Sequence, residues 1–148
     1  MPIVIAQAID LRALGAIIDV EISPVASVIQ ATIDAGGAVP APIKMSAQID
    51  TGASRSVIQT GIAQKLGLRP VGVKFVHTAS ALNFRCERYS LRVTYLPTSG
   101  LMVPVTFNAT FTEAPLRGKN FQCLIGRDFL AKAVFTYIGP TNSFVLSL

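Results

Sequence analysis

Several residue types that support common chemistries are scarce in this chain. Among its 148 residues there are one histidine, two cysteines and no tryptophan, and only 14% are charged. A single histidine, His77, leaves no partner for a two-histidine metal site. Because Cys86 and Cys123 form no CxxC or Cys/His cluster, we interpret them as buried reduced thiols of an intracellular protein. We therefore expect no metal and no cofactor.

Long apolar runs are missing as well. No stretch approaches the roughly 18 uninterrupted apolar residues that a membrane-spanning helix needs, because Asp10, Asp19, Asp34 and later charges divide the chain. The first seven residues lack the basic leader of a signal peptide, and their apolar run is short. The sequence thus predicts no membrane span and a cytoplasmic location.

Positive charge is in excess but is not concentrated. The formal net charge is +5, yet the lysines and arginines are spread along the chain without a basic run interleaved with aromatic residues. Nucleic-acid binding is therefore not expected. Hydrophobic residues make up 51% of the chain, with a mean hydropathy of +0.52, so much apolar surface must be covered, and an oligomer would cover it.

The patterning predicts an all-β domain with one or two helical turns. Apolar residues alternate in 18–22, 43–49, 91–95 and 102–111, and turn residues fill 35–42, 97–100 and 138–142. Two short segments have helical signals: 60–67, with Thr60 as the expected N-cap and Gly67 as the stop, and 128–132. The length predicts one domain over 1–148.

One polar loop follows a predicted strand. Asp50 comes directly after the alternating segment 43–49 and is followed by Thr51, Gly52, Ala53 and Ser54. Gly52 permits a sharp turn, and the small side chains let a second copy of the loop approach closely. Two carboxylates about 3 Å apart share one proton, so that one activates a water while the other hydrogen-bonds a carbonyl oxygen.

The chain resembles the retropepsin-like aspartic proteases, a single-domain class. Three features carry the resemblance in order: 49–54 with its Asp-Thr-Gly, the following Val57 and Ile58 with a helix up to residue 68, and 123–130 with its Leu-Ile-Gly-Arg-Asp segment. The resemblance implies a closed β-barrel of the acid-protease fold and hydrolysis of peptide bonds by an endopeptidase. It implies Asp50 as the catalytic residue, supported by Thr51, Gly52, Ala53 and Ser54.

The same resemblance implies further roles. Thr51 would interlock with its mate across a dimer, Gly52 would offer its carbonyl to a peptide or protein substrate, and a segment behind the active site would orient the loop. That structural segment comprises Leu124, Ile125, Gly126, Arg127 and Asp128. Because the chain holds one Asp-Thr-Gly, activity would require a homodimer formed through the active-site loop and the terminal strands.

A flap over the substrate is expected in 73–86. Two apolar-alternating arms meet at a tip without glycine, and the flap or substrate-binding residues would be His77, Thr78, Ala79, Ser80 and Ala81. The motif-bearing core is 43–131. Residues 1–40 form an N-terminal extension that adds a strand, masks the dimer interface or is removed, and 143–148 is an expected interface strand.

The same residues allow other interpretations. A retropepsin-like domain without activity would serve as a peptide-binding or oligomerisation module. A serine nucleophile at Ser54 or Ser80 with His77 lacks a nucleophile-elbow signature. Asp128 as a second carboxylate within the chain is disfavoured, because an acid at a helix start is usually a cap. Arg55 is either a surface residue or a contact to acidic side chains of the substrate. Arg127 is either a surface residue or forms an ion pair with Asp128 that braces the loop or the dimer contact.

Overall fold

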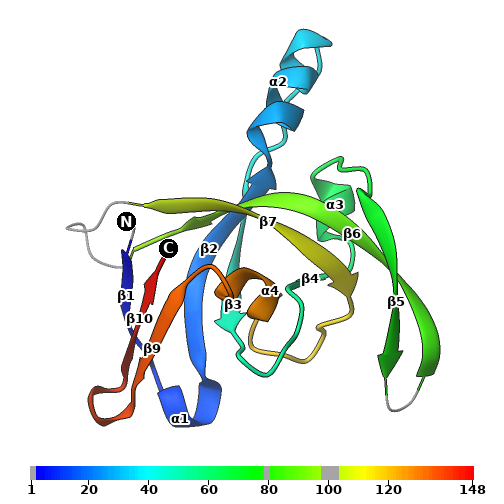
Figure 1. Ribbon diagram of the computed structural model, residues 1–148. Coiled ribbons are helices and arrows are strands. Elements are labelled where there is room, and N and C mark those ends of the chain that lie inside the picture. Colours follow the sequence, from blue (N-terminus) through cyan, green and yellow to red (C-terminus); the bar gives the residue numbers. More distant parts are fainter. Residues whose placement is uncertain (1–2, 79–80, 98–103) are drawn as a thin grey trace.

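The computed structural model describes residues 3–78, 81–97 and 104–148 (Figure 1). Strands dominate these residues, which confirms the predicted all-β class. In chain order the elements are β1 (Ile3–Gln7), α1 (Leu11–Leu14), β2 (Ala16–Pro24), α2 (Ala26–Asp34), β3 (Ile43–Ile49), β4 (Val57–Gln59), α3 (Ile62–Lys65), β5 (Gly72–Thr78), β6 (Ala81–Tyr95), β7 (Val105–Ala114), β8 (Cys123–Ile125), α4 (Arg127–Leu130), β9 (Val134–Ile138), the 3-10 turn Gly139–Thr141 and β10 (Ser143–Ser147).

Six strands close into a barrel. They pair in the order β2-β3-β8-β4-β7-β6, and β6 returns to β2, with Val20 opposite Tyr95 and Pro24 opposite Leu91. Strand β5 lies outside this ring and pairs only with β6, so the two form a hairpin that extends from the barrel (Figure 1). Closure removes the free sheet edges that would otherwise invite pairing with other chains.

The two ends of the chain meet in a separate three-stranded sheet. Strand β10 lies in the middle, antiparallel to β1 on one side and to β9 on the other (Figure 1). Residues 143–147 are therefore a strand, as predicted, and its backbone is already paired on both sides within the chain. Because side chains alternate along a strand, Val4 is buried while Ile3 and Ile5 remain exposed.

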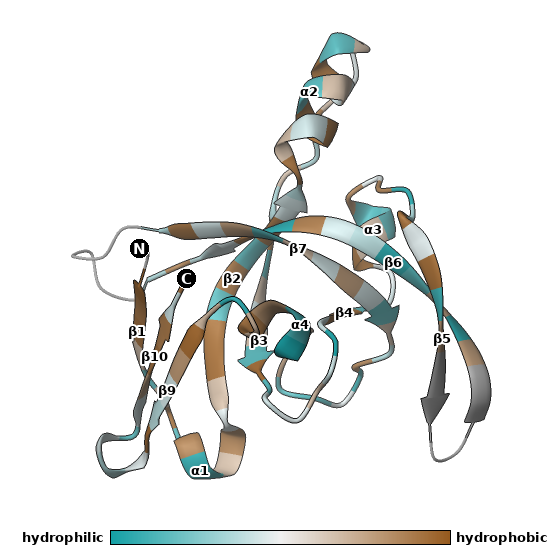
Figure 2. Cartoon of the chain, in the orientation of Figure 1, coloured by the Kyte–Doolittle hydropathy of each residue, from teal (hydrophilic) through white to brown (hydrophobic). Residues whose placement is uncertain are grey.

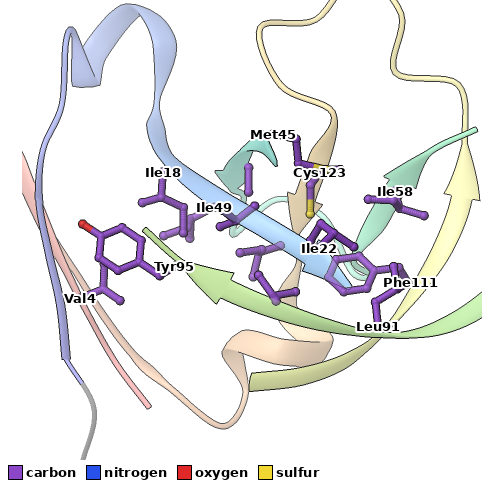
Figure 3. Close-up of a cluster of buried hydrophobic side chains, with 14 of the residues drawn as sticks. Val4, Ile18, Ile22, Met45, Ile49, Ile58, Leu91, Tyr95, Phe111 and Cys123 are labelled. Carbon is purple, nitrogen blue, oxygen red and sulfur yellow. The ribbon is translucent and has the colours of Figure 1, made fainter. Parts of the chain in front are cut away.

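One hydrophobic core joins the barrel and the terminal sheet. It extends from Val4 in β1 through Ile22, Leu91 and Phe111 to Leu146 in β10 (Figure 3 shows part of it). Cys86 and Cys123 are both buried free thiols. Desolvation by burial raises the pKa of the Cys123 thiol, so this side chain stays protonated at neutral pH.

The two helices predicted from the sequence are present but shorter than expected. Helix α3 begins after Gly61, which has a φ of 91°, so Gly61 and not Thr60 is its N-cap. The Thr60 prediction was wrong because the left-handed turn into the helix is made by Gly61, while Thr60 continues the pairing of β4 with β7 through its backbone N–H to Ala114 O. Gly67, with a φ of 65°, follows the helix as predicted. None of the described helices is long and apolar enough to cross a membrane.

Helix α2 was not predicted. It follows β2, has nine residues and buries none of them. Figure 1 shows it standing away from the barrel, and Figure 2 shows apolar residues along it. Its valine, two isoleucines and threonine are weak helix formers, which explains why residues 26–34 gave no helical signal.

Candidate active site

Asp50 lies where the ends of β3 and β8 meet in the barrel. It follows the last residue of β3, and its backbone N–H donates to Ile125 O at the end of β8 over 2.9 Å. The carboxylate is half-buried, and its Oδ1 accepts from Gly52 N–H over 2.8 Å. A carboxylate held by a backbone N–H has a fixed orientation. We call residues 50–55 the Asp50 loop.

Two glycines in this region lie in close contact with their neighbours. A Cβ on Gly52 would lie 3.0 Å from Asp50 Oδ1, so a side chain there would crowd the carboxylate. A Cβ on Gly126 would lie 2.5 Å from the carbonyl carbon and oxygen of Arg55, a distance that no real Cβ contact adopts. The absence of a side chain at Gly126 therefore lets β8 and α4 pack directly against the loop.

Arg127 binds the outer side of the Asp50 loop. Its Nη1 donates to Thr51 O over 2.8 Å and to Gly52 O over 3.1 Å, while its backbone N–H donates to Ala53 O over 2.9 Å. Of the two alternatives for Arg127, the ion pair with Asp128 is not formed, because the guanidinium donates to loop carbonyls instead. Gly52 O, expected to face a substrate, thus already accepts one hydrogen bond within the chain.

A buried serine connects the loop to α4. Ser56 is 1% exposed. Its N–H and its hydroxyl donate to the Asp128 carboxylate over 2.9 and 2.8 Å, and its Oγ accepts from Gly126 N–H over 3.0 Å. Asp128 also accepts from Phe129 N–H, and Gly126 occupies the N-cap position. Asp128 therefore joins helix and loop rather than capping α4 alone.

Sequence reasoning did not identify Ser56. It follows the Asp-Thr-Gly loop by only a few residues and is the first residue after Arg55. A hydroxyl just before the apolar strand β4 was the available signal, but its acceptor lies 72 residues further along the chain.

The predicted flap is a hairpin of β5 and β6, paired from Gly72 opposite Arg88 to Thr78 opposite Ala81. His77 and Thr78 end β5 and Ala81 begins β6, while Ala79 and Ser80 lie outside the described residues. Nearer the barrel, Phe75 and Phe84 are 58% and 52% exposed. Exposed aromatic rings on a hairpin arm suit contact with another chain.

The predicted residues thus form two groups. Asp50, Thr51, Gly52 and Ala53 lie in contact with Ile125, Gly126, Arg127 and Asp128 directly or through Ser56. Ser54 is exposed. The hairpin residues are joined to this cluster by no hydrogen bond among the described residues. Within the same residues, no three His, Cys, Asp or Glu side chains gather as a metal site would require.

The segment that contains this loop matches a known protein family. The family model described as aspartyl protease matches residues 29–129, about two thirds of the chain. The matched range contains the Asp50 loop, the β5–β6 hairpin, Ser56 and Asp128. This chain belongs to the aspartyl protease family.

A solved structure supports the fold. The chain is similar to a retropepsin-like aspartic protease from Rickettsia conorii, with a TM-score of 0.51 and 16% identity over 97% of this chain and 89% of that one. The predicted retropepsin-like barrel is confirmed by this likeness. A search of curated protein sequences gave no match.

Proposed function

We propose that the chain is an aspartic endopeptidase that works as a homodimer, with Asp50 from each subunit forming the catalytic pair. One carboxylate takes a proton from a bound water, whose oxygen attacks the carbonyl carbon of the scissile peptide bond. The protonated partner hydrogen-bonds the carbonyl oxygen. Collapse of the tetrahedral intermediate breaks the C–N bond as the nitrogen takes a proton, leaving a carboxylic acid and an amine.

The observation that carries the proposal is the isolated, oriented carboxylate of Asp50. Its Oδ1 is held by Gly52 N–H within a loop that β8, Ser56 and Arg127 brace from behind. The other carboxylate of this region, Asp128, is bonded to Ser56 and Phe129. A second reactive carboxylate must therefore come from a second chain.

The terminal sheet supports a dimer whose contacts differ from those expected for the strand at 143–148. Because β10 is paired on both sides, partner strands cannot flank it unless β1 or β9 is displaced. The free edges of β1 and β9 and the exposed side chains of Ile3, Ile5 and Val134 remain available. We propose that the dimer uses these and the Asp50 loops, while the β5–β6 hairpin covers an extended peptide substrate.

Substitution Asp50→Asn tests the catalytic role. We expect loss of cleavage of a diverse peptide library, read by mass spectrometry, with unchanged circular dichroism and sedimentation. Asp34→Asn, the same change in exposed helix α2, should cleave as wild type. Cleavage by Asp50→Asn at the wild-type rate would exclude the mechanism.

The same peptide library distinguishes an active peptidase from a peptide-binding module without activity. A wild-type chain that binds peptides without cutting them at any pH would be a binding module that retains the fold. A pepstatin-type inhibitor should block cleavage if the Asp50 pair performs it, whereas inhibition by a serine reagent alone would exclude the pair.

A further inference from the structure

A pocket lies next to the Asp50 loop, between β6, β7 and α4. Its volume is about 290 Å³. Its polar lining residues come from these elements, from the end of the loop and from the segments just after the loop and the helix: Arg55, Ser56, Arg88, Asn108, Thr110, Asp128 and Lys132. We call it the basic pocket.

The charges of the basic pocket are not balanced. It has three cationic side chains, Arg55, Arg88 and Lys132, and one carboxylate. That carboxylate, Asp128, is already bonded to Ser56 and to Phe129 N–H. Among the side chains that the structure describes, the one ion pair joins Lys44 to Glu21, so none of the three cations is ion-paired and the pocket keeps an excess of positive charge.

Arg88, which lines the basic pocket, has one side-chain atom without a partner. Arg88 Nε is buried and, in the described part of the chain, is the one buried side-chain nitrogen or oxygen without a hydrogen bond. A buried N–H that has lost water and gained no acceptor is costly. Such atoms are rare in native proteins and usually have a reason, such as an ion that binds there.

We infer that the basic pocket binds an oxyanion. A carboxylate or phosphate oxygen would accept from the Arg88 guanidinium, and the side chains of Arg55 and Lys132 would neutralise the negative charge of the bound anion. Asn108 and Thr110 offer further donors beside them. The pocket volume is close to the lower end for ligand sites, which suits a small anionic group.

This oxyanion has two possible sources, a free anion or an acidic side chain of a peptide substrate. Arg55 is the last residue of the Asp50 loop and Ser56 follows it directly. Both line the pocket and so connect it to the proposed catalytic centre. Assignment to a substrate side chain rests on the proposed function, whereas oxyanion binding does not.

The first experiment titrates the protein with sodium phosphate at constant ionic strength, with sodium chloride as the comparison. Saturable shifts are expected in the nitrogen–proton spectrum at Arg88 Nε–H and Ser56 N–H. We expect Arg88→Gln and Arg55→Gln each to raise the Kd by about tenfold. The matched control Arg69→Gln removes an exposed charge outside the pocket and should leave the Kd unchanged.

Three results would overturn the inference: no saturable shift at millimolar phosphate, equal shifts with chloride, or an equal Kd in all three variants. Arg55 is exposed, so its replacement keeps the test valid even if Arg88→Gln fails to fold. Phosphate should also raise the Tm of the wild type more than that of Arg55→Gln, because a ligand stabilises the state that binds it.

The second experiment identifies the source. Paired peptides that carry Glu or Gln at successive subsites are compared by the ratio of their kcat/KM values. If a substrate side chain occupies the pocket, the wild type favours Glu at one subsite, and Arg55→Gln lowers that preference about tenfold. Phosphate binding without such a preference supports a free anion as the source. No cleavage of any peptide refutes the proposed function, while the phosphate titration still shows whether the basic pocket binds an oxyanion.

Discussion

The Asp50 loop and helix α2 lie at opposite ends of strand β3, and the chain holds them in opposite ways. The loop is fixed by backbone bonds to β8, by the buried hydroxyl of Ser56 and by Arg127. Helix α2 buries none of its nine residues and stands away from the barrel (Figure 1). One strand therefore joins an end held by several hydrogen bonds, where the proposed chemistry needs fixed atoms, to an end that contributes little to the core.

The rigidity of the loop comes from few atoms. Gly126 has no side chain and so leaves room for the backbone of Arg55. The Ser56 hydroxyl accepts from Gly126 N–H and donates to the Asp128 carboxylate. A change at any of these residues should lower the free energy of unfolding, because buried polar groups and close contacts have no room to rearrange. A substitution in α2 removes only a side chain that is already at least partly exposed, so it should change the free energy of unfolding little. The difference can be measured by substitutions of similar size at the two ends of β3.

The largest effect is expected from Gly126→Ala. The new Cβ would meet the backbone of Arg55 at 2.5 Å, and a backbone cannot rotate away as a side chain can. We expect a loss of about 3 kcal/mol in the free energy of unfolding, measured by urea denaturation, and loss of peptide cleavage. Gly72→Ala is the control, because a Cβ there meets nothing within 4 Å. A Gly126→Ala protein as stable as Gly72→Ala would show that the loop yields easily.

A smaller effect is expected from Ser56→Ala. It removes the acceptor of Gly126 N–H and a donor to Asp128, while the Ser56 backbone N–H still binds the carboxylate. Because the site is 1% exposed, water cannot replace these bonds. We expect a loss of about 1 to 3 kcal/mol.

The comparison for Ser56→Ala is Ser54→Ala, two residues earlier on the exposed side of the same loop. It should change the unfolding free energy by less than about 0.5 kcal/mol. Equal losses in the two variants would contradict the role of the buried hydroxyl.

The sequence could predict what depends on local pattern. Residues 43–49 alternate and form β3 over the same residues, and the Asp-Thr-Gly that follows them identifies the loop. It could not predict the Ser56–Asp128 bond or the steric requirement at Gly126, because these depend on which distant segments the barrel brings together. Helix α2 was missed for the opposite reason: its β-branched residues are not typical of helices, and no burial accompanies them.

The smallest effect is expected from Ile33→Ala in α2. Ile33 is 53% exposed, so its removal leaves no cavity, and alanine is the better helix former. The unfolding free energy should change by less than about 0.5 kcal/mol. The same substitution at Ile22, which is 0% exposed in β2, should cost about 2 to 5 kcal/mol. A loss above about 1 kcal/mol for Ile33→Ala would mean that another surface covers α2 in solution, and dilution of the protein would then reduce that loss if the surface belongs to a second copy.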